Sequence, residues 1–224
     1  MLNVAEQSGA YWVYGALNRV DDNGVFMSIN RPEVEGNVFG LSVAGDAFHI
    51  SASLIRRDIY FQVGCFDPTV NTSEDIDLQC RIAFIGEIGR TDRTVADIRV
   101  GVWGNTTTQW HKKQADIRQV REKALNLPGA LGRMRDSVKG DVNLRGRCCR
   151  AYAVSTVLNL KAGRFFSAAS RLLALPLLAS FYVCVPEFWR GLLMRSHWHQ
   201  NEKDREYDHY AEYYPEKEVT PQAW

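Results

Sequence analysis

The chain has 224 residues, of which 46% are hydrophobic and 24% are charged. This length and composition predict one folded domain with appendages, because the apolar fraction is large enough to bury a core. They exclude a chain that is too polar to form a packed core. The net charge of +1 indicates no partner by itself. Five cysteines, an odd number with no Cys-x-x-Cys pair, favour a reducing compartment.

The first ten residues contain neither a basic start nor a sustained apolar run, so no signal segment is expected and the protein is predicted to be cytoplasmic. Residues 13–20 and 25–29 are rich in β-branched and aromatic side chains and flank Asn23-Gly24. This pattern predicts a β-hairpin.

Further along, the pattern predicts a strand over residues 48–55, a short helix over 58–63, a helix over 74–85 and a strand over 93–102. Later residues predict helices over 110–127, 144–160 and 165–175, the first ended by Pro128-Gly129. The alternation of strands and helices in the first half predicts an α/β fold, followed by a helical C-terminal extension.

Three carboxylates occupy the first turn of the helix predicted over 74–85. Ser73 is a suitable N-cap, which places Glu74 and Asp75 at the first two helical positions, with Asp77 two residues further on. One or two acids there would stabilise the helix, and ordinary capping accounts for many such turns. Three acids suggest an additional role.

Neighbouring helical side chains point about 100° apart, so Glu74 and Asp75 cannot face each other across one bond as glycosidase carboxylates do. A single ionised acid at a loop–helix junction suits a general base. Such a moderate base fits sugar transfer from an activated donor.

Four motif pieces lie in and around this helix: Ser53-Leu54-Ile55-Arg56-Arg57, Val63-Gly64-Cys65-Phe66-Asp67, Ser73-Glu74-Asp75-Ile76-Asp77-Leu78 and Arg81-Ile82-Ala83. These pieces resemble glycosyltransferase family 2. They occur in the order and spacing of the acceptor-side signature of that family, and the resemblance covers roughly residues 11–110. It implies part of an A-type glycosyltransferase fold, with a mixed sheet and helices.

The resemblance also implies roles for individual residues. Asp75 would be the base of an inverting transfer from a nucleotide-sugar to an acceptor hydroxyl, and Glu74 would support its loop. Asp77 would cap the helix or accept from backbone N–H groups. The acceptor would bind at the residues before the helix, namely Arg56, Gly64, Cys65, Phe66 and Asp67.

Family members carry a nucleotide-binding half and an Asp-x-Asp motif for Mg²⁺ or Mn²⁺ before this region. Here the only candidate is Asp21-Asp22-Asn23-Gly24, which fits better as the hairpin turn. The chain is therefore expected to begin downstream of the donor site, to supply no metal ligand and to bind no nucleotide-sugar alone. Magnesium or manganese is expected by resemblance only.

Charge is unevenly distributed along the second half. Residues 111–164 contain thirteen Lys or Arg side chains against four acids, and residues 201–224 contain seven acids against three basic side chains. This basic block predicts an anionic surface nearby. Nucleic acid is not expected, because residues 109–127 have no aromatic after Trp110 and show no recognisable motif.

Residues 165–194 are the most apolar part of the chain. Their longest uncharged run, residues 172–186, has 15 residues, which is short of the ~20 needed to cross a bilayer. Two interpretations stay open: core helices kinked or started at Pro176 and Pro186, or an interfacial segment with Tyr182, Phe188 and Trp189 at headgroup depth. The second would make the protein peripheral at the inner face of the membrane.

These expectations give three regions: residues 1–110 as the acceptor-side part, 111–195 as a basic and then apolar helical extension, and 196–224 as a disordered acidic, Tyr-rich tail. The predicted function is transfer of a sugar from a nucleotide-sugar to a saccharide or lipid-linked acceptor. A non-catalytic membrane-surface or partner-binding module and a structural remnant remain as alternatives.

Overall fold

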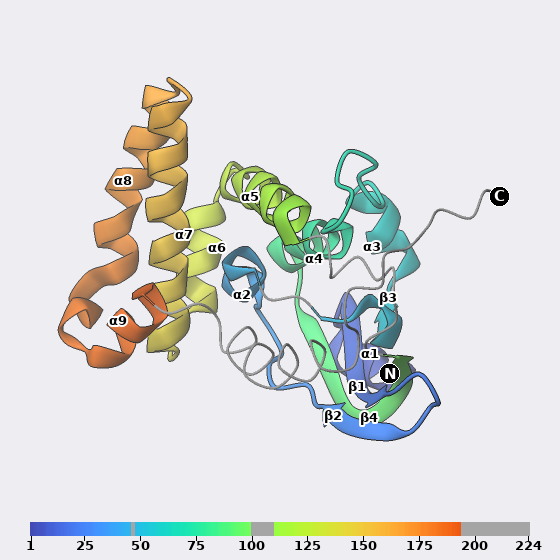
Figure 1. Ribbon diagram of the computed structural model, residues 1–224. Helices are drawn as coiled ribbons and strands as arrows, with labels where there is room; N and C mark the ends of the chain where they lie inside the picture. The colour runs from blue at the N-terminus through green and yellow to red at the C-terminus, as the bar shows by residue number, and fades with distance from the viewer. Residues whose placement is uncertain (46–47, 100–109, 194–224) are drawn as a thin grey trace, which may run out of the picture. The chain divides into compact units, whose positions relative to one another are not determined.

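The computed structural model describes residues 1–45, 48–99 and 110–193, with only the backbone for 110–114 (Figure 1). Within these residues, helices combine with a four-stranded mixed sheet, so the predicted α/β class is confirmed. The tail predicted over 196–224 and the last residues of the strand predicted over 93–102 lie outside the described residues.

The sheet is built around β1 (Trp12–Val20). Along one edge β1 pairs in parallel with β4 (Ile88–Arg99), from Trp12 beside Ile88 to Val20 beside Arg99. The other edge is shared by two antiparallel strands, β3 (Ser53–Ile55) beside the start of β1 and β2 (Phe26–Asn30) beside its end. The parallel pair requires a crossover, and that crossover contains the acidic helix.

The predicted hairpin is confirmed in β1 and β2. Asp21 accepts the backbone N–H groups of Asn23 (2.9 Å) and Val25 (2.8 Å) on its Oδ1, and Gly24 has a φ of +82°. The Asp21 side chain thus forms an Asx turn, and Gly24 adopts the left-handed conformation that glycine reaches without cost. The two aspartates of this segment therefore belong to a turn.

The crossover contains α2 (Phe39–Ala44), α3 (Arg57–Gln62) and α4 (Glu74–Ile85). The predicted bounds of α4 are confirmed. The strand predicted over 48–55 is wrong in its first half, where a 3₁₀ turn, Ile50–Ala52, precedes the short β3. Two helices of the first half were not predicted, α2 and the N-terminal α1 (Leu2–Ser8), and neither was the helix Ala130–Ser137 of the second half.

The second half consists of helices: α5 (Trp110–Leu125), α6 (Ala130–Ser137), α7 (Val142–Lys161), α8 (Phe165–Ala179), the 3₁₀ helix η3 (Ser180–Cys184) and α9 (Pro186–Leu193). One hydrophobic core includes Trp12 of β1, Phe39 of α2, Leu78 of α4 and Tyr152 of α7. The described residues up to Arg99 and the helices from α5 onward thus share a core.

The backbones of α7 and α9 touch. A Cβ placed on Gly146 of α7 would lie 2.1 Å from the carbonyl oxygen of Phe188, and one placed on Gly191 of α9 would lie 1.9 Å from that of Asn143. Both distances are far too short for a carbon and an oxygen that are not bonded to each other, so the crossing requires residues without a side chain at both positions. This contact fixes α9 on α7.

Several arginines of the basic block bind main-chain carbonyls within the protein. Arg121 donates to the carbonyl of Val43 near the end of α2 (2.9 Å). Arg133 donates to the carbonyls of Ala83 (3.1 Å) and Gly86 at the end of α4. Arg145 donates to the carbonyl of Leu178 near the end of α8 (2.7 Å). These guanidinium groups bind the carbonyls that helix ends leave unsatisfied. These three arginines therefore bind within the protein, and the anionic surface predicted for the block stays a prediction for its other side chains.

The aromatic residues near the end of the described chain also differ from expectation. Phe188 is buried, and Tyr182 is half-buried, with its ring 4.4 Å from the guanidinium carbon of Arg145. Of the three aromatics proposed for headgroup depth, only Trp189 is well exposed, at 45%.

Candidate functional site

The three acids at the start of α4 lie in three different environments. Glu74 is exposed, Asp75 is half-buried and Asp77 is buried. Asp75 accepts the N–H of Ile76 on its Oδ1 at 2.8 Å, a contact that uses one of the free N–H groups of the first turn. The helical rotation between successive positions separates these carboxylates, as expected from the sequence.

The residue before α4 differs from the expectation. Ser73 occupies the N-cap position and its carbonyl accepts the N–H of Asp77 (3.0 Å), but its hydroxyl is buried and has no hydrogen-bond partner among the described residues. The prediction that this hydroxyl caps the helix is therefore wrong. The residue fits the position because its side chain is small enough to be buried there.

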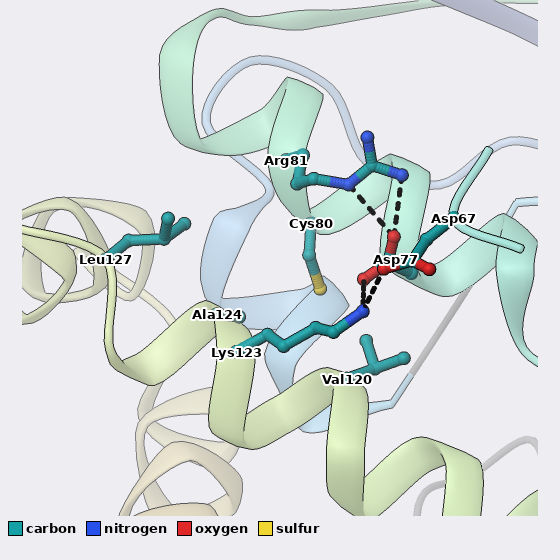
Figure 2. A pocket seen from close by; sticks show the side chains of 8 residues that line it. All are labelled: Asp67, Asp77, Cys80, Arg81, Val120, Lys123, Ala124 and Leu127. Carbon is teal, nitrogen blue, oxygen red and sulfur yellow. Dashed lines mark hydrogen bonds and ion pairs between the residues drawn. The ribbon is translucent and has the colours of Figure 1, made fainter. Parts of the chain in front are cut away.

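Asp77 forms the centre of a charged cluster (Figure 2). Its Oδ2 accepts from Arg81 Nε (2.9 Å) and Nη2 (2.6 Å), and its Oδ1 lies 3.6 Å from Lys123 Nζ of α5. Arg81 also donates to the carbonyl of Val63 at 2.6 Å. The expectation that Asp77 caps the helix or accepts from backbone N–H groups is replaced by a side-chain ion pair.

The turn from Gly64 to Asp67 joins α3 to the loop before α4. Gly64 and Cys65 both have positive φ, +89° and +61°, so the chain reverses sharply after α3. Phe66 is 40% exposed, with its ring 5.8 Å from that of Tyr60. Cys65 is half-buried. The turn thus presents an aromatic ring to solvent.

Asp67 closes this turn and binds α5. Its Oδ1 accepts from the N–H (2.8 Å) and hydroxyl (2.6 Å) of Thr69, and its Oδ2 forms an ion pair with Lys123. The hydrogen bond from Lys123, followed by those from Thr69, holds the pKa of Asp67 well below its usual range. Asp67 therefore remains ionised at neutral pH and is a poor proton acceptor.

The pH dependence of stability should reveal this pair. Because the pKa of Asp67 is lowered in the folded state, its contribution is complete above the usual Asp value near ~4 and is lost as pH falls below that value. Urea unfolding of wild type and Asp67→Asn should differ at neutral pH and converge in acid. In a Lys123→Met background, the difference in the free energy of unfolding that Asp67→Asn causes should vary much less with pH. If the difference in the free energy of unfolding between wild type and Asp67→Asn stays constant down to strong acid, the lowered pKa of Asp67 is contradicted.

A second carboxylate of α5 holds the loop between Asp67 and α4. Asp116 Oδ2 accepts the backbone N–H groups of Asn71 (3.2 Å) and Thr72 (2.8 Å) and the hydroxyl of Thr72 (2.8 Å). Asp116 and Lys123 are seven residues apart, so they lie on one face of α5. Together they position the loop that leads to Asp75.

A pocket of about 140 Å³ lies between α4 and α5 (Figure 2). Its walls are Asp67, Asp77, Cys80, Arg81, Val120, Lys123, Ala124 and Leu127. Asp75 is not among them. Burial raises the pKa of the Cys80 thiol to about 12, so this cysteine is an unreactive wall residue.

Arg56 lies apart from this pocket. It forms an exposed ion pair with Asp58 (2.6 Å), and its guanidinium carbon is 5.1 Å from the centre of the Tyr11 ring. The structure therefore brings Asp67 and Asp77 together with Arg81, and it places Asp75 and Arg56 elsewhere on the surface of the same domain.

The carboxylates of the pocket do not fit a divalent-cation site, because Lys123 and Arg81 already neutralise them. No three His, Cys, Asp or Glu side chains within the described residues form a group suited to a metal ion. Magnesium or manganese stays a prediction from resemblance.

Sequence reasoning missed the part that α5 contributes. Arg81 is four residues after Asp77, and this spacing is itself a signal for an ion pair on a helix. Lys123 and Asp116 gave no such signal, because their contacts with the loop join residues far apart in the chain.

Comparisons with protein-family models, with curated proteins and with solved structures find no match to this chain.

Proposed function

We propose that the start of α4 and the turn before it form the acceptor side of an inverting glycosyltransferase of family 2, in an A-type fold. The acceptor is a hydroxyl of a saccharide or of a lipid-linked sugar, and the donor is a nucleotide-sugar. The observation that carries the proposal is the different environment of each acid in one helical turn: exposed Glu74, half-buried Asp75 and buried, ion-paired Asp77.

These environments favour Asp75 as the base. Asp77 is enclosed and its oxygens face Arg81 and Lys123, while Asp67 has a lowered pKa and an ion pair with Lys123. A general base must be reachable by the acceptor and must accept its proton. Asp75 combines partial exposure with a position fixed by the Ile76 N–H.

In the proposed reaction, the Asp75 carboxylate takes the proton of the acceptor hydroxyl as that oxygen forms a bond to the anomeric carbon. The bond from this carbon to the donor phosphate breaks, and the nucleoside diphosphate leaves with the bonding electron pair. The exposed Phe66 provides an apolar face near the acceptor, of the kind on which sugar rings stack. The loop between Phe66 and Asp75 is held by Asp116 and Lys123 of α5.

The test is a transfer assay with the protein as its source cell makes it, so that any donor-binding residues outside this sequence are present. The protein is incubated with a panel of nucleotide-sugars, Mg²⁺ or Mn²⁺, and saccharide or lipid-linked acceptors. Release of nucleoside diphosphate that depends on acceptor, with a glycosylated product of the expected mass, supports the proposal. Absence of acceptor-dependent release across the panel overturns it.

A further inference from the structure

Helix α8 is apolar on its exposed side as well as on its buried side. Its buried positions are Ala168, Arg171, Ala174 and Leu178, which recur every three or four residues along one stripe. The opposite side includes Phe166, Leu173 and Leu177, which are 91%, 72% and 53% exposed. A helix that packs by one stripe in water normally carries polar residues on the other.

The exposed side of α8 also lacks charge. Arg171 is the single charged residue between Phe165 and Val185, and it is only 8% exposed. Its guanidinium donates to Asn126 Oδ1 and lies 5.9 Å from the centre of the Tyr152 ring, so it points into the protein. The charge that interrupts the apolar run in the sequence is therefore absent from the surface.

Large apolar side chains lie at the start of this side, along its second half and in the turn that follows. We call these residues the α8 surface: Phe165, Phe166, Leu172, Leu173, Leu177 and Phe181, all more than half exposed. Phe181 of η3 is 92% exposed. At the other end, exposed Lys161 and Arg164 immediately precede Phe165. Exposed apolar area of this extent marks an interaction site.

We infer that the α8 surface binds an anionic lipid bilayer, with α8 lying along the membrane interface. Aromatic and leucine side chains on one side of a helix, with basic residues beside them, are typical of helices that insert into the headgroup–acyl boundary. The charges of Lys161 and Arg164 match acidic headgroups. This inference does not depend on the proposed glycosyltransferase reaction.

The packing of α8 favours lying on the bilayer over crossing it. The segment Phe165–Cys184 has the length and composition to span a membrane. However, α8 lies antiparallel against α7 (Figure 1), and Arg145 and Arg171 bind Leu178 and Asn126 within this packing. A spanning α8 would have to leave α7 and carry Arg171 into hydrocarbon, which is costly.

Vesicle flotation of the full chain tests the inference. Wild-type protein should float with vesicles of phosphatidylcholine and phosphatidylglycerol. The double variant Phe166→Asp/Leu173→Asp should bind at least ~100-fold more weakly, because two large side chains no longer enter the acyl boundary. Both positions are exposed, so the fold should be retained, which circular dichroism checks. The matched control, Phe26→Asp/Met27→Asp, changes two exposed apolar residues of β2 and should bind like wild type.

A second pair of variants tests the charges. Lys161→Gln/Arg164→Gln should weaken binding to anionic vesicles about 20-fold in low salt and have little effect on pure phosphatidylcholine vesicles. The inference is overturned if the wild-type protein does not float with anionic vesicles. It is also overturned if Phe26→Asp/Met27→Asp loses as much vesicle binding as Phe166→Asp/Leu173→Asp. A wild-type dimer in sedimentation velocity that becomes a monomer in Phe166→Asp/Leu173→Asp would instead assign the surface to a second copy of the chain.

Discussion

Replacing Asp75 by Asn is expected to reduce sugar transfer by at least ~100-fold, the usual contribution of a positioned general base. The amide keeps the shape of the side chain and can still lie against the Ile76 N–H through its oxygen, so the fold and the acceptor site should persist. The loss should therefore fall on kcat, with KM for the acceptor nearly unchanged. Initial rates of nucleoside diphosphate release over a range of acceptor concentrations measure both.

Glu74→Gln is the matched control, because Glu74 is the preceding residue in the same turn and is exposed. Its transfer rate should stay within a few fold of wild type. If Asp75→Asn retains near-normal turnover while Glu74→Gln loses it, the base is Glu74 and the assignment to Asp75 is wrong. A rate that neither substitution changes places the base outside this turn.

Replacing Arg81 by Met is expected to lower the free energy of unfolding by about 3 kcal/mol, since removing one partner of a buried ion pair leaves the other uncompensated. Asp77 would lose its contacts at 2.9 and 2.6 Å, and of its ion pairs within the described part of the chain it would keep Lys123 at 3.6 Å. The carbonyl of Val63 would lose its donor as well. Urea unfolding followed by circular dichroism measures the change.

Two further variants make this prediction specific. Arg190→Met removes the cation of an exposed pair with Glu187, at 63% and 51% exposure, and should cost less than about 1 kcal/mol. Asp77→Asn should cost less in the Arg81→Met background than in wild type, because the two residues act as one unit. Additive effects of the two substitutions would show that the pair contributes little.

The local parts of the fold could be predicted from the sequence. The β-hairpin followed from Asn23-Gly24 between two strand-like runs, and the bounds of α4 followed from its acidic first turn and apolar spacing. The strand predicted over 48–55 was shortened to Ser53–Ile55, and α2 was missed. Both are short segments whose structure depends on packing, which local propensity does not report.

The same limit applies to the candidate site. The positions of Glu74, Asp75 and Asp77 around the helix follow from residue spacing alone. Their environments depend on α5, whose Lys123 approaches Asp77 only after the chain has folded. The Ser73 hydroxyl illustrates the difference, because this residue is suited to capping but its hydroxyl is buried and finds no partner in the part of the chain that the structure describes. Composition likewise could not show that Arg121, Arg133 and Arg145 bind helix-end carbonyls.

The crossing of α7 and α9 provides a structural criterion for recognising distant relatives. A protein with the same arrangement must carry glycine where Gly146 and Gly191 stand here, because any larger residue would collide with a main-chain oxygen. Most of the surrounding apolar residues could be exchanged for others of similar volume without loss of the fold. A search that weights this glycine pair above general similarity could therefore detect kinship after the rest of the sequence has diverged.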